Sequence, residues 1–253
     1  PQRYFLQLSF KGTNYHGWQV QPNAVSVQEV MEKSLSTLLR EEISVVGAGR
    51  TDTGVHASFF VLHFDSENEH IDAQKLIFKL NNFLPKDIAV QQLQKVEANA
   101  HARFSALSRT YRYFISKKKD PFGNEHAYWF WGKTDVQKMN EAAAVLFEYD
   151  DFTSFSRTHT DVKTNLCKIY KAEWTEKDDR LVFTIKADRF LRNMVRAIVG
   201  TLLEVGRGKM NIDEFRGVIE KKDRGAAGTS APAQGLFLTH IEYPEEIGIP
   251  GSN

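Results

Sequence analysis

The sequence predicts an α+β fold built from two split β-α-β halves, each with an antiparallel sheet backed by helices. Two observations predict it. The expected elements of residues 3–96 follow the order β-α-β-β-α-β, and the second part of the chain repeats that order without a matching sequence repeat. Apolar residues make up 42% and charged residues 26% of the 253 residues, which supplies enough apolar material for a core. We therefore expect an N-terminal half at residues 1–105 and a C-terminal half at residues 106–253.

The elements of the N-terminal half follow from apolar periodicity and from helix-end signals. Its strands are expected at residues 3–10, 43–48, 58–64 and 88–96. Its helices are expected at residues 26–40 and 72–83. Ser26 and Glu29 fit the capping-box pattern at the start of the first helix. The second helix ends before Pro85, because a residue that precedes proline disfavours the helical conformation.

The C-terminal half shows the same kinds of signal. Its strands are expected at residues 109–116, 167–175, 181–187 and 236–243, the middle two as a hairpin. Its helices are expected at residues 134–147, 190–205 and 212–221. Thr134 and Gln137 form a capping pattern at the first of these helices. Gly206 and Gly208 end the second, because glycine favours helix ends.

Charge and cysteine content narrow the class of protein. The net charge is +1, from 33 basic and 32 acidic residues, so binding to a nucleic acid would require the basic residues to gather on one face. A single cysteine, Cys167, allows no intrachain disulfide and fits a reducing compartment. No stretch approaches 18 consecutive apolar residues, so we expect a cytoplasmic protein with no membrane partner.

Residues 47–57 (GAGRTDTGVHA) are the stretch most suggestive of chemistry. An apolar strand leads into a loop that carries three glycines, and Arg50 and Asp52 lie two residues apart between them. A carboxylate near a guanidinium stays ionised and oriented, as an active site requires. A tight turn with an internal Arg–Asp bridge would have the same pattern. Spacing alone leaves both interpretations open.

Residues 49–56 (GRTDTGVH) resemble the signature loop of the TruA family of pseudouridine synthases. Further motifs stand in that family's order at residues 12–19 (GTNYHGWQ), 26–28 (SVQ), 102–106 (ARFSA), 109–113 (RTYRY), 151–155 (DFTSF), 193–200 (NMVRAIVG) and 232–238 (PAQGLFL). The resemblance covers nearly the whole chain and implies the pseudouridine synthase fold, with ferredoxin/RRM-like halves. Lys11 departs from it, because the family usually has Asp there, and local RNA contacts in that loop are expected to differ.

The resemblance implies that Asp52 is the catalytic carboxylate of an isomerase acting on uridines 38, 39 and 40 of the tRNA anticodon stem-loop. Attack at the sugar, attack at the base and elimination through a glycal all remain open for it. The substrate-binding residues implied with it are Arg50 and Arg196 as charge partners, Tyr111 as the active-site tyrosine, and Val55 and Leu236 as apolar walls. For a tyrosine in an alternating strand, and for the two apolar residues, packing in the core is the alternative.

Basic residues near these motifs are candidates for RNA contacts: Arg103, Arg109, Arg112, Lys117, Lys118, Lys119, Arg157, Lys163, Arg189 and Arg192. The family forms homodimers, and a redox-neutral isomerisation needs no cofactor. The histidines are scattered without a metal-binding spacing, so no metal is expected. The alternative function is a catalytically inactive RNA-binding protein of the same fold. A glycosidase is disfavoured, because that class needs two facing carboxylates.

Overall fold

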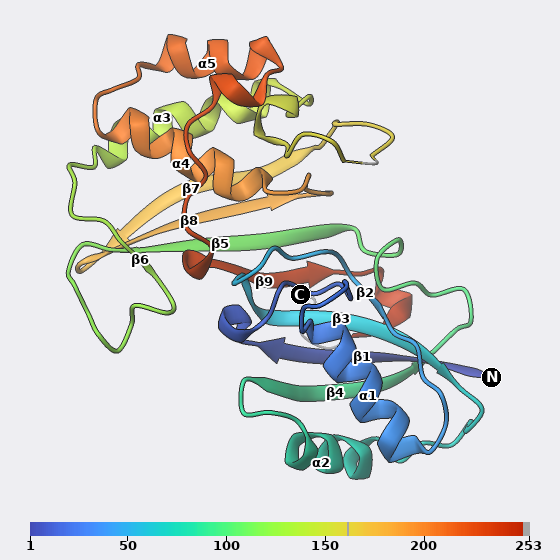
Figure 1. Ribbon diagram of the computed structural model, residues 1–253. Helices are drawn as coiled ribbons and strands as arrows, with labels where there is room; N and C mark the ends of the chain where they lie inside the picture. The colour runs from blue at the N-terminus through green and yellow to red at the C-terminus, as the bar shows by residue number, and fades with distance from the viewer. Residues whose placement is uncertain (161, 250–253) are drawn as a thin grey trace. The chain divides into compact units, whose positions relative to one another are not determined.

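The computed structural model describes residues 1–160 and 162–249 (Figure 1). Its contacts divide the chain into two compact units. The first comprises Pro1–Ser108 together with the chain from Leu238 onward, and the second comprises Arg109–Phe237. The C-terminal strand thus ends within the first unit, where the Leu107 amide donates to the Glu242 carbonyl at 2.7 Å. The expected division into residues 1–105 and 106–253 did not contain this return of the chain.

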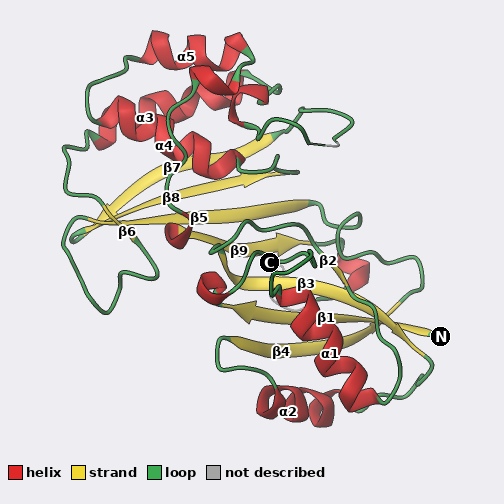
Figure 2. Ribbon diagram, in the orientation of Figure 1, coloured by secondary structure: helices red, strands yellow, loops and turns green. Residues whose placement is uncertain are grey.

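The first unit is an antiparallel sheet with two helices. Its elements are β1 (Gln2–Phe10), α1 (Val27–Leu39), β2 (Val46–Gly47), β3 (His56–Ser66), α2 (Ala73–Phe83) and β4 (Ile88–Val96). Strand β1 lies between β3 and β4 and is antiparallel to both, with Leu6 opposite Leu62 and Leu93. Helix α2 packs against β4, and α1 contacts α2 (Figure 2). The predicted element order of this half is confirmed.

Local signals account for the helix starts of the first unit. The Ser26 hydroxyl accepts the Glu29 amide at 3.2 Å, as the capping pattern predicts. Asp72 caps α2 in the same way, by accepting the Lys75 amide at 3.0 Å. The strand predicted at residues 43–48 is shorter than expected, because only Val46–Gly47 pairs with β3.

The second unit has three main strands and three helices. Its elements are β5 (Ser108–Ser116), β6 (Tyr128–Trp129), α3 (Val136–Val145), β7 (Ile169–Lys177), β8 (Arg180–Ala187), α4 (Met194–Gly206), α5 (Ile212–Lys221) and β9 (Leu236–Glu242). Strands β5 and β9 extend into the first unit. Strand β8 is antiparallel to β5 and to β7. The three helices contact one another, and α3 packs against β7 (Figure 1). The predicted α+β class is confirmed, with the short parallel pair of β5 and β6 as an addition.

Two helix starts in this unit differ from the predictions. Asp135, not Thr134, caps α3 and accepts the Lys138 amide at 3.1 Å. Helix α4 begins at Met194 and not near residue 190, because Asn193 adopts a left-handed conformation with φ of 67°. Within the described ranges, no helix is both long enough and apolar enough to cross a membrane.

Candidate functional site

Asp52, expected from the sequence to be the catalytic carboxylate, lies on the loop that joins β2 to β3. For that expectation we call this segment the catalytic loop (residues 48–55). Its side chain is half-buried, whereas that of Arg50 is exposed. The Val55 amide donates to the Asp52 carbonyl at 3.1 Å and so closes a turn around the carboxylate-bearing residue. Val55 itself is 2% exposed, so its side chain belongs to the packed part of the first unit.

A second loop, residues 11–18, supports the catalytic loop through backbone contacts. The Trp18 amide donates to the Thr51 carbonyl, and the Gly54 amide donates to the Tyr15 carbonyl, both at 3.4 Å. These two bonds flank Asp52 on either side in the sequence. At the end of the loop, Nδ1 of the buried His56 accepts the Gly12 amide at 2.9 Å.

Glycine is needed in the supporting loop for this approach. A Cβ atom on Gly12 would lie 2.0 Å from the Val55 carbonyl oxygen, and one on Gly17 would lie 2.3 Å from that of Thr51. Gly17 also has a φ of +76°, which side-chain-bearing residues rarely adopt. The sequence singled out residues 12–19 only as a family motif, and the structure shows that their backbone supports the catalytic loop.

The second unit carries the two tyrosines of β5. Tyr113 is fully buried, and its hydroxyl donates to the Pro232 carbonyl at 2.6 Å. Burial raises the pKa of Tyr113, so its phenol stays neutral and structural. Tyr111 is half-buried, with its ring edge-on to Phe190 at 5.1 Å. Tyr111 is therefore the more accessible of the pair. Leu236, also expected at the pocket, is 6% exposed at the start of β9.

Arg196 lies in the first turn of α4 and contacts the segment before β9. Its Nε donates to the Ala231 carbonyl at 2.8 Å, and its own carbonyl accepts the Ala231 amide at 2.9 Å. Arg224 fixes the same segment, because its guanidinium donates to the Gly228 carbonyl at 3.0 Å and to the Ser230 hydroxyl at 2.8 Å. Backbone and side-chain bonds together therefore set the position of the Arg196 guanidinium.

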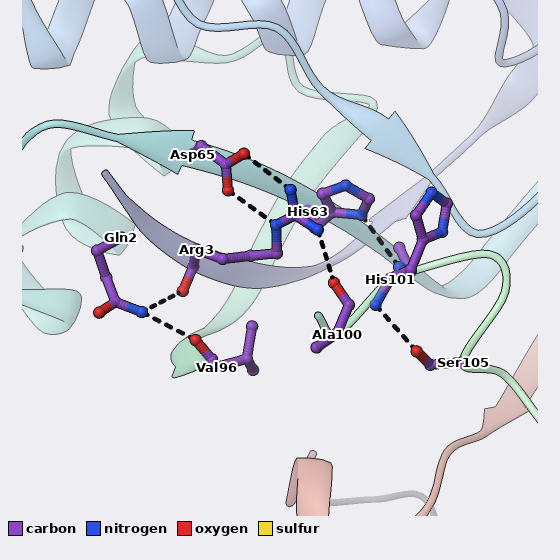
Figure 3. Close-up of polar contacts among 9 residues, drawn as sticks. Gln2, Arg3, His63, Asp65, Val96, Ala100, His101 and Ser105 are labelled. Atoms are coloured by element: carbon purple, nitrogen blue, oxygen red, sulfur yellow. Dashed lines mark hydrogen bonds and ion pairs between the residues drawn. The ribbon is translucent and has the colours of Figure 1, made fainter. Parts of the chain in front are cut away.

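Arg3, Asp65, His63 and His101 form a cluster in the first unit (Figure 3). Its hydrogen bonds position the turn that carries Arg103. Arg3 makes a two-bond ion pair with Asp65, at 2.8 Å for each bond, and donates to the Ala100 carbonyl at 3.0 Å. The buried His63 accepts the Ala102 amide through Nδ1 at 3.0 Å. Both contacts hold the chain immediately before Arg103.

His101 completes that turn. Its Nδ1 accepts the amides of Arg103 and Phe104, each at 3.1 Å. The Phe104 ring stacks on His101 at 4.3 Å and is 75% exposed, with the Arg103 guanidinium 5.5 Å from its centre. A cation and an exposed aromatic ring on a fixed turn are suited to contact a phosphate and a base.

The other basic candidates differ in their surroundings. Lys117 and Lys118 pair with Glu176 and Asp179, which reduces their value as phosphate ligands. Lys119 lies over the Trp129 ring at 5.6 Å.

Two further candidate arginines donate to backbone carbonyls: Arg109 to that of Asp188 at 3.0 Å, and Arg189 to that of Thr164 at 2.9 Å. The remaining candidates are all exposed: Arg112, Arg157, Lys163 and Arg192.

Comparisons with known proteins indicate the same family as the sequence motifs. A family model described as tRNA pseudouridine synthase matches residues 8–105 and 142–244. A protein of Bacteroides fragilis named tRNA pseudouridine synthase A is 59% identical over 247 residues, which cover 97% of this chain and 98% of the relative. A protein of the same name from Bacteroides thetaiotaomicron is 59% identical over 249 residues, covering 97% and 92%. The one from Bacillus subtilis is 44% identical over 240 residues, covering 93% and 97%.

Proposed function

This chain belongs to the tRNA pseudouridine synthase family, and on that premise we propose that it converts uridines of the tRNA anticodon stem-loop, at positions 38, 39 and 40, to pseudouridine. The observation that carries the proposal is the catalytic loop, because it presents the half-buried Asp52 between two backbone contacts to residues 11–18. A carboxylate fixed in this way can act on a bound nucleoside without a metal or a cofactor.

The reaction breaks the C1′–N1 bond of uridine, turns the base and forms a C5–C1′ bond, while the C5 proton leaves and N1 gains one. Asp52 attacks the sugar, attacks the base or assists elimination through a glycal. All three routes use the same carboxylate. The base must leave the RNA stack to reach it.

We assign the other site residues to roles around that base. Tyr111 stacks on the uracil or takes part in removal of the C5 proton, which its accessibility relative to Tyr113 supports. Arg50 and Arg196 are the charge partners of Asp52. Val55 and Leu236 form apolar walls of the pocket.

For the RNA, the proposed partners are the basic side chains beside these motifs, with Arg103 as the best supported of them. The Arg3 and His63 contacts fix the backbone of its turn, so little backbone order has to be gained on binding. A homodimer in the cytoplasm that binds the tRNA across both copies is part of the same proposal.

Release of tritium from tRNA labelled at uridine C5 tests the proposal. The wild-type protein should release tritium, and Asp52→Asn should release none, because the amide cannot replace the carboxylate. Asp178→Asn is the matched control: Asp178 is exposed at the β7–β8 turn with φ of 55°, a conformation that asparagine tolerates. It should keep wild-type activity.

The outcomes separate the two candidate functions. A wild-type protein that binds tRNA without releasing tritium would be the inactive RNA-binding alternative. Full release by Asp52→Asn would remove Asp52 from the mechanism while leaving the activity in place.

A further inference from the structure

Tyr15, in the supporting loop, makes a hydrogen bond that no step of the proposed reaction uses. Its side chain is 5% exposed, and its hydroxyl donates to Oδ1 of Asp87 at 2.5 Å. Asp87 immediately precedes β4 and also accepts the Lys11 amide through its carbonyl at 2.9 Å. Burial and the bond to Asp87 raise the pKa of Tyr15, so the phenol remains a donor throughout the neutral range.

The same residue contacts the catalytic loop through its backbone. The Tyr15 carbonyl accepts the Gly54 amide, two residues after Asp52. Three residues beyond Tyr15, Trp18 donates to the carbonyl of Thr51, which directly precedes Asp52. Asp87 therefore connects to both flanks of the catalytic carboxylate through one short stretch of chain.

The two contacts that flank Asp52 are long. Both measure 3.4 Å, beyond the usual 2.7–3.2 Å for an amide donor. Contacts of this length hold the catalytic loop only as firmly as residues 15–18 are themselves held. The position of the catalytic loop then depends on how firmly residues 15–18 are held from their other side, and the bond from Tyr15 to a carboxylate is of the stronger, charge-assisted kind.

We propose that Tyr15 and Asp87 are positioning residues for catalysis, which hold residues 11–18 so that these place Asp52 against the uridine. The assignment rests on the proposed function for its kinetic consequence. Neither side chain touches the substrate. Their loss displaces the carboxylate, and a displacement of about 1 Å can lower a rate by roughly 100-fold.

The first test is kinetic and uses the full chain with tRNA. Tyr15→Phe removes only the hydroxyl and should lower kcat by about tenfold or more, while KM for tRNA changes less than about twofold. Asp87→Ala should do the same. Asp87→Asn keeps an oxygen acceptor for the phenol and should recover most of the wild-type kcat.

Tyr4→Phe is the matched control. Tyr4 is 2% exposed in β1, and its hydroxyl donates to the Asn68 carbonyl at 2.9 Å, away from both loops. The two variants lose the same group from a similarly buried site. Tyr4→Phe should lower stability and leave kcat unchanged.

The second test does not need activity. Hydrogen exchange of peptides that cover residues 48–56 should accelerate in Tyr15→Phe and Asp87→Ala relative to wild type, but not in Tyr4→Phe. Wild-type kcat together with unchanged exchange in Tyr15→Phe would overturn the assignment. A raised KM with unchanged kcat would also overturn it, because it would indicate an RNA contact. A wild-type protein without activity would sink the proposed function, and the exchange comparison would still decide the positioning role.

Discussion

Protonation of His63 should destabilise the first unit as the pH falls. The imidazole is 5% exposed in β3, and its Nδ1 accepts the Ala102 amide, which requires the unprotonated form. Burial lowers the pKa of His63 from 6.5 to about 4, with further lowering by the nearby Arg3 and His101 and a smaller opposing effect of Asp65. Figure 3 shows Arg3, Asp65 and His101 near His63.

The direction of this pH effect follows from the number of protons that His63 binds in the folded and in the unfolded state. Between pH 6.5 and about 4 the unfolded chain binds a proton at His63 and the folded chain does not, so acid favours unfolding. Well above pH 6.5 His63 is neutral in both the folded and the unfolded state, and it has no such effect. Integrated from pH 7 to pH 5, this difference removes about 2 kcal/mol from the free energy of unfolding.

Urea denaturation of wild type and His63→Gln at pH 7 and pH 5 measures this loss in the free energy of unfolding. Glutamine offers an oxygen acceptor to the Ala102 amide but does not titrate, so the variant should lose about 2 kcal/mol less over this interval than wild type does. His70→Gln changes an exposed histidine of the same unit, which remains in contact with water in both states, and should follow wild type. If His63→Gln loses as much stability as wild type, His63 does not titrate between these pH values and the argument fails.

Two further outcomes are expected. In Gly200→Ala the new Cβ would lie 1.8 Å from the Thr229 carbonyl oxygen, so this variant should lose about 1–3 kcal/mol of stability and much of its tritium release. The control is Gly217→Ala, whose Cβ position has nothing within 4 Å, and it should lose neither. Arg103→Gln should reduce the salt slope of tRNA binding by about 0.7–0.9, and Lys221→Gln, in α5, should not; equal slopes would remove Arg103 from the RNA contacts.

The fold was predictable where short stretches of sequence determine it. The Ser26 cap of α1 needs only residues within one turn, and the structure contains it. Thr134 and Asp135 can both cap a helix, and the pattern alone did not select Asp135. The start of α4 depends on Asn193, whose side-chain amide donates through Nδ2 to the Ser230 hydroxyl at 2.6 Å. That contact spans 37 residues, and no local signal could reveal it.

The candidate site, like the fold, was predictable from the sequence only in part. Asp52 is predicted as the catalytic carboxylate through an ordered set of motifs, because the spacing of Arg50 and Asp52 fits an inert turn equally well. Tyr15 and Asp87, which we propose as positioning residues, were not predicted from the sequence, although Tyr15 lies within one of these motifs. A single tyrosine in a loop gives no signal of its partner 72 residues away, and an aspartate before a strand is usually exposed.

The glycines show most clearly that a sequence motif does not by itself indicate what each of its residues does in the structure. Gly54 of the catalytic loop has a φ of 82°, a conformation that favours glycine. Gly49, however, has nothing within 4 Å of its Cβ position. The tightest approach to this loop is made by Gly12, which belongs to a different motif. Residues of two loops therefore hold Asp52 in place, and under the proposed function substitutions in residues 11–18 should lower the rate of catalysis.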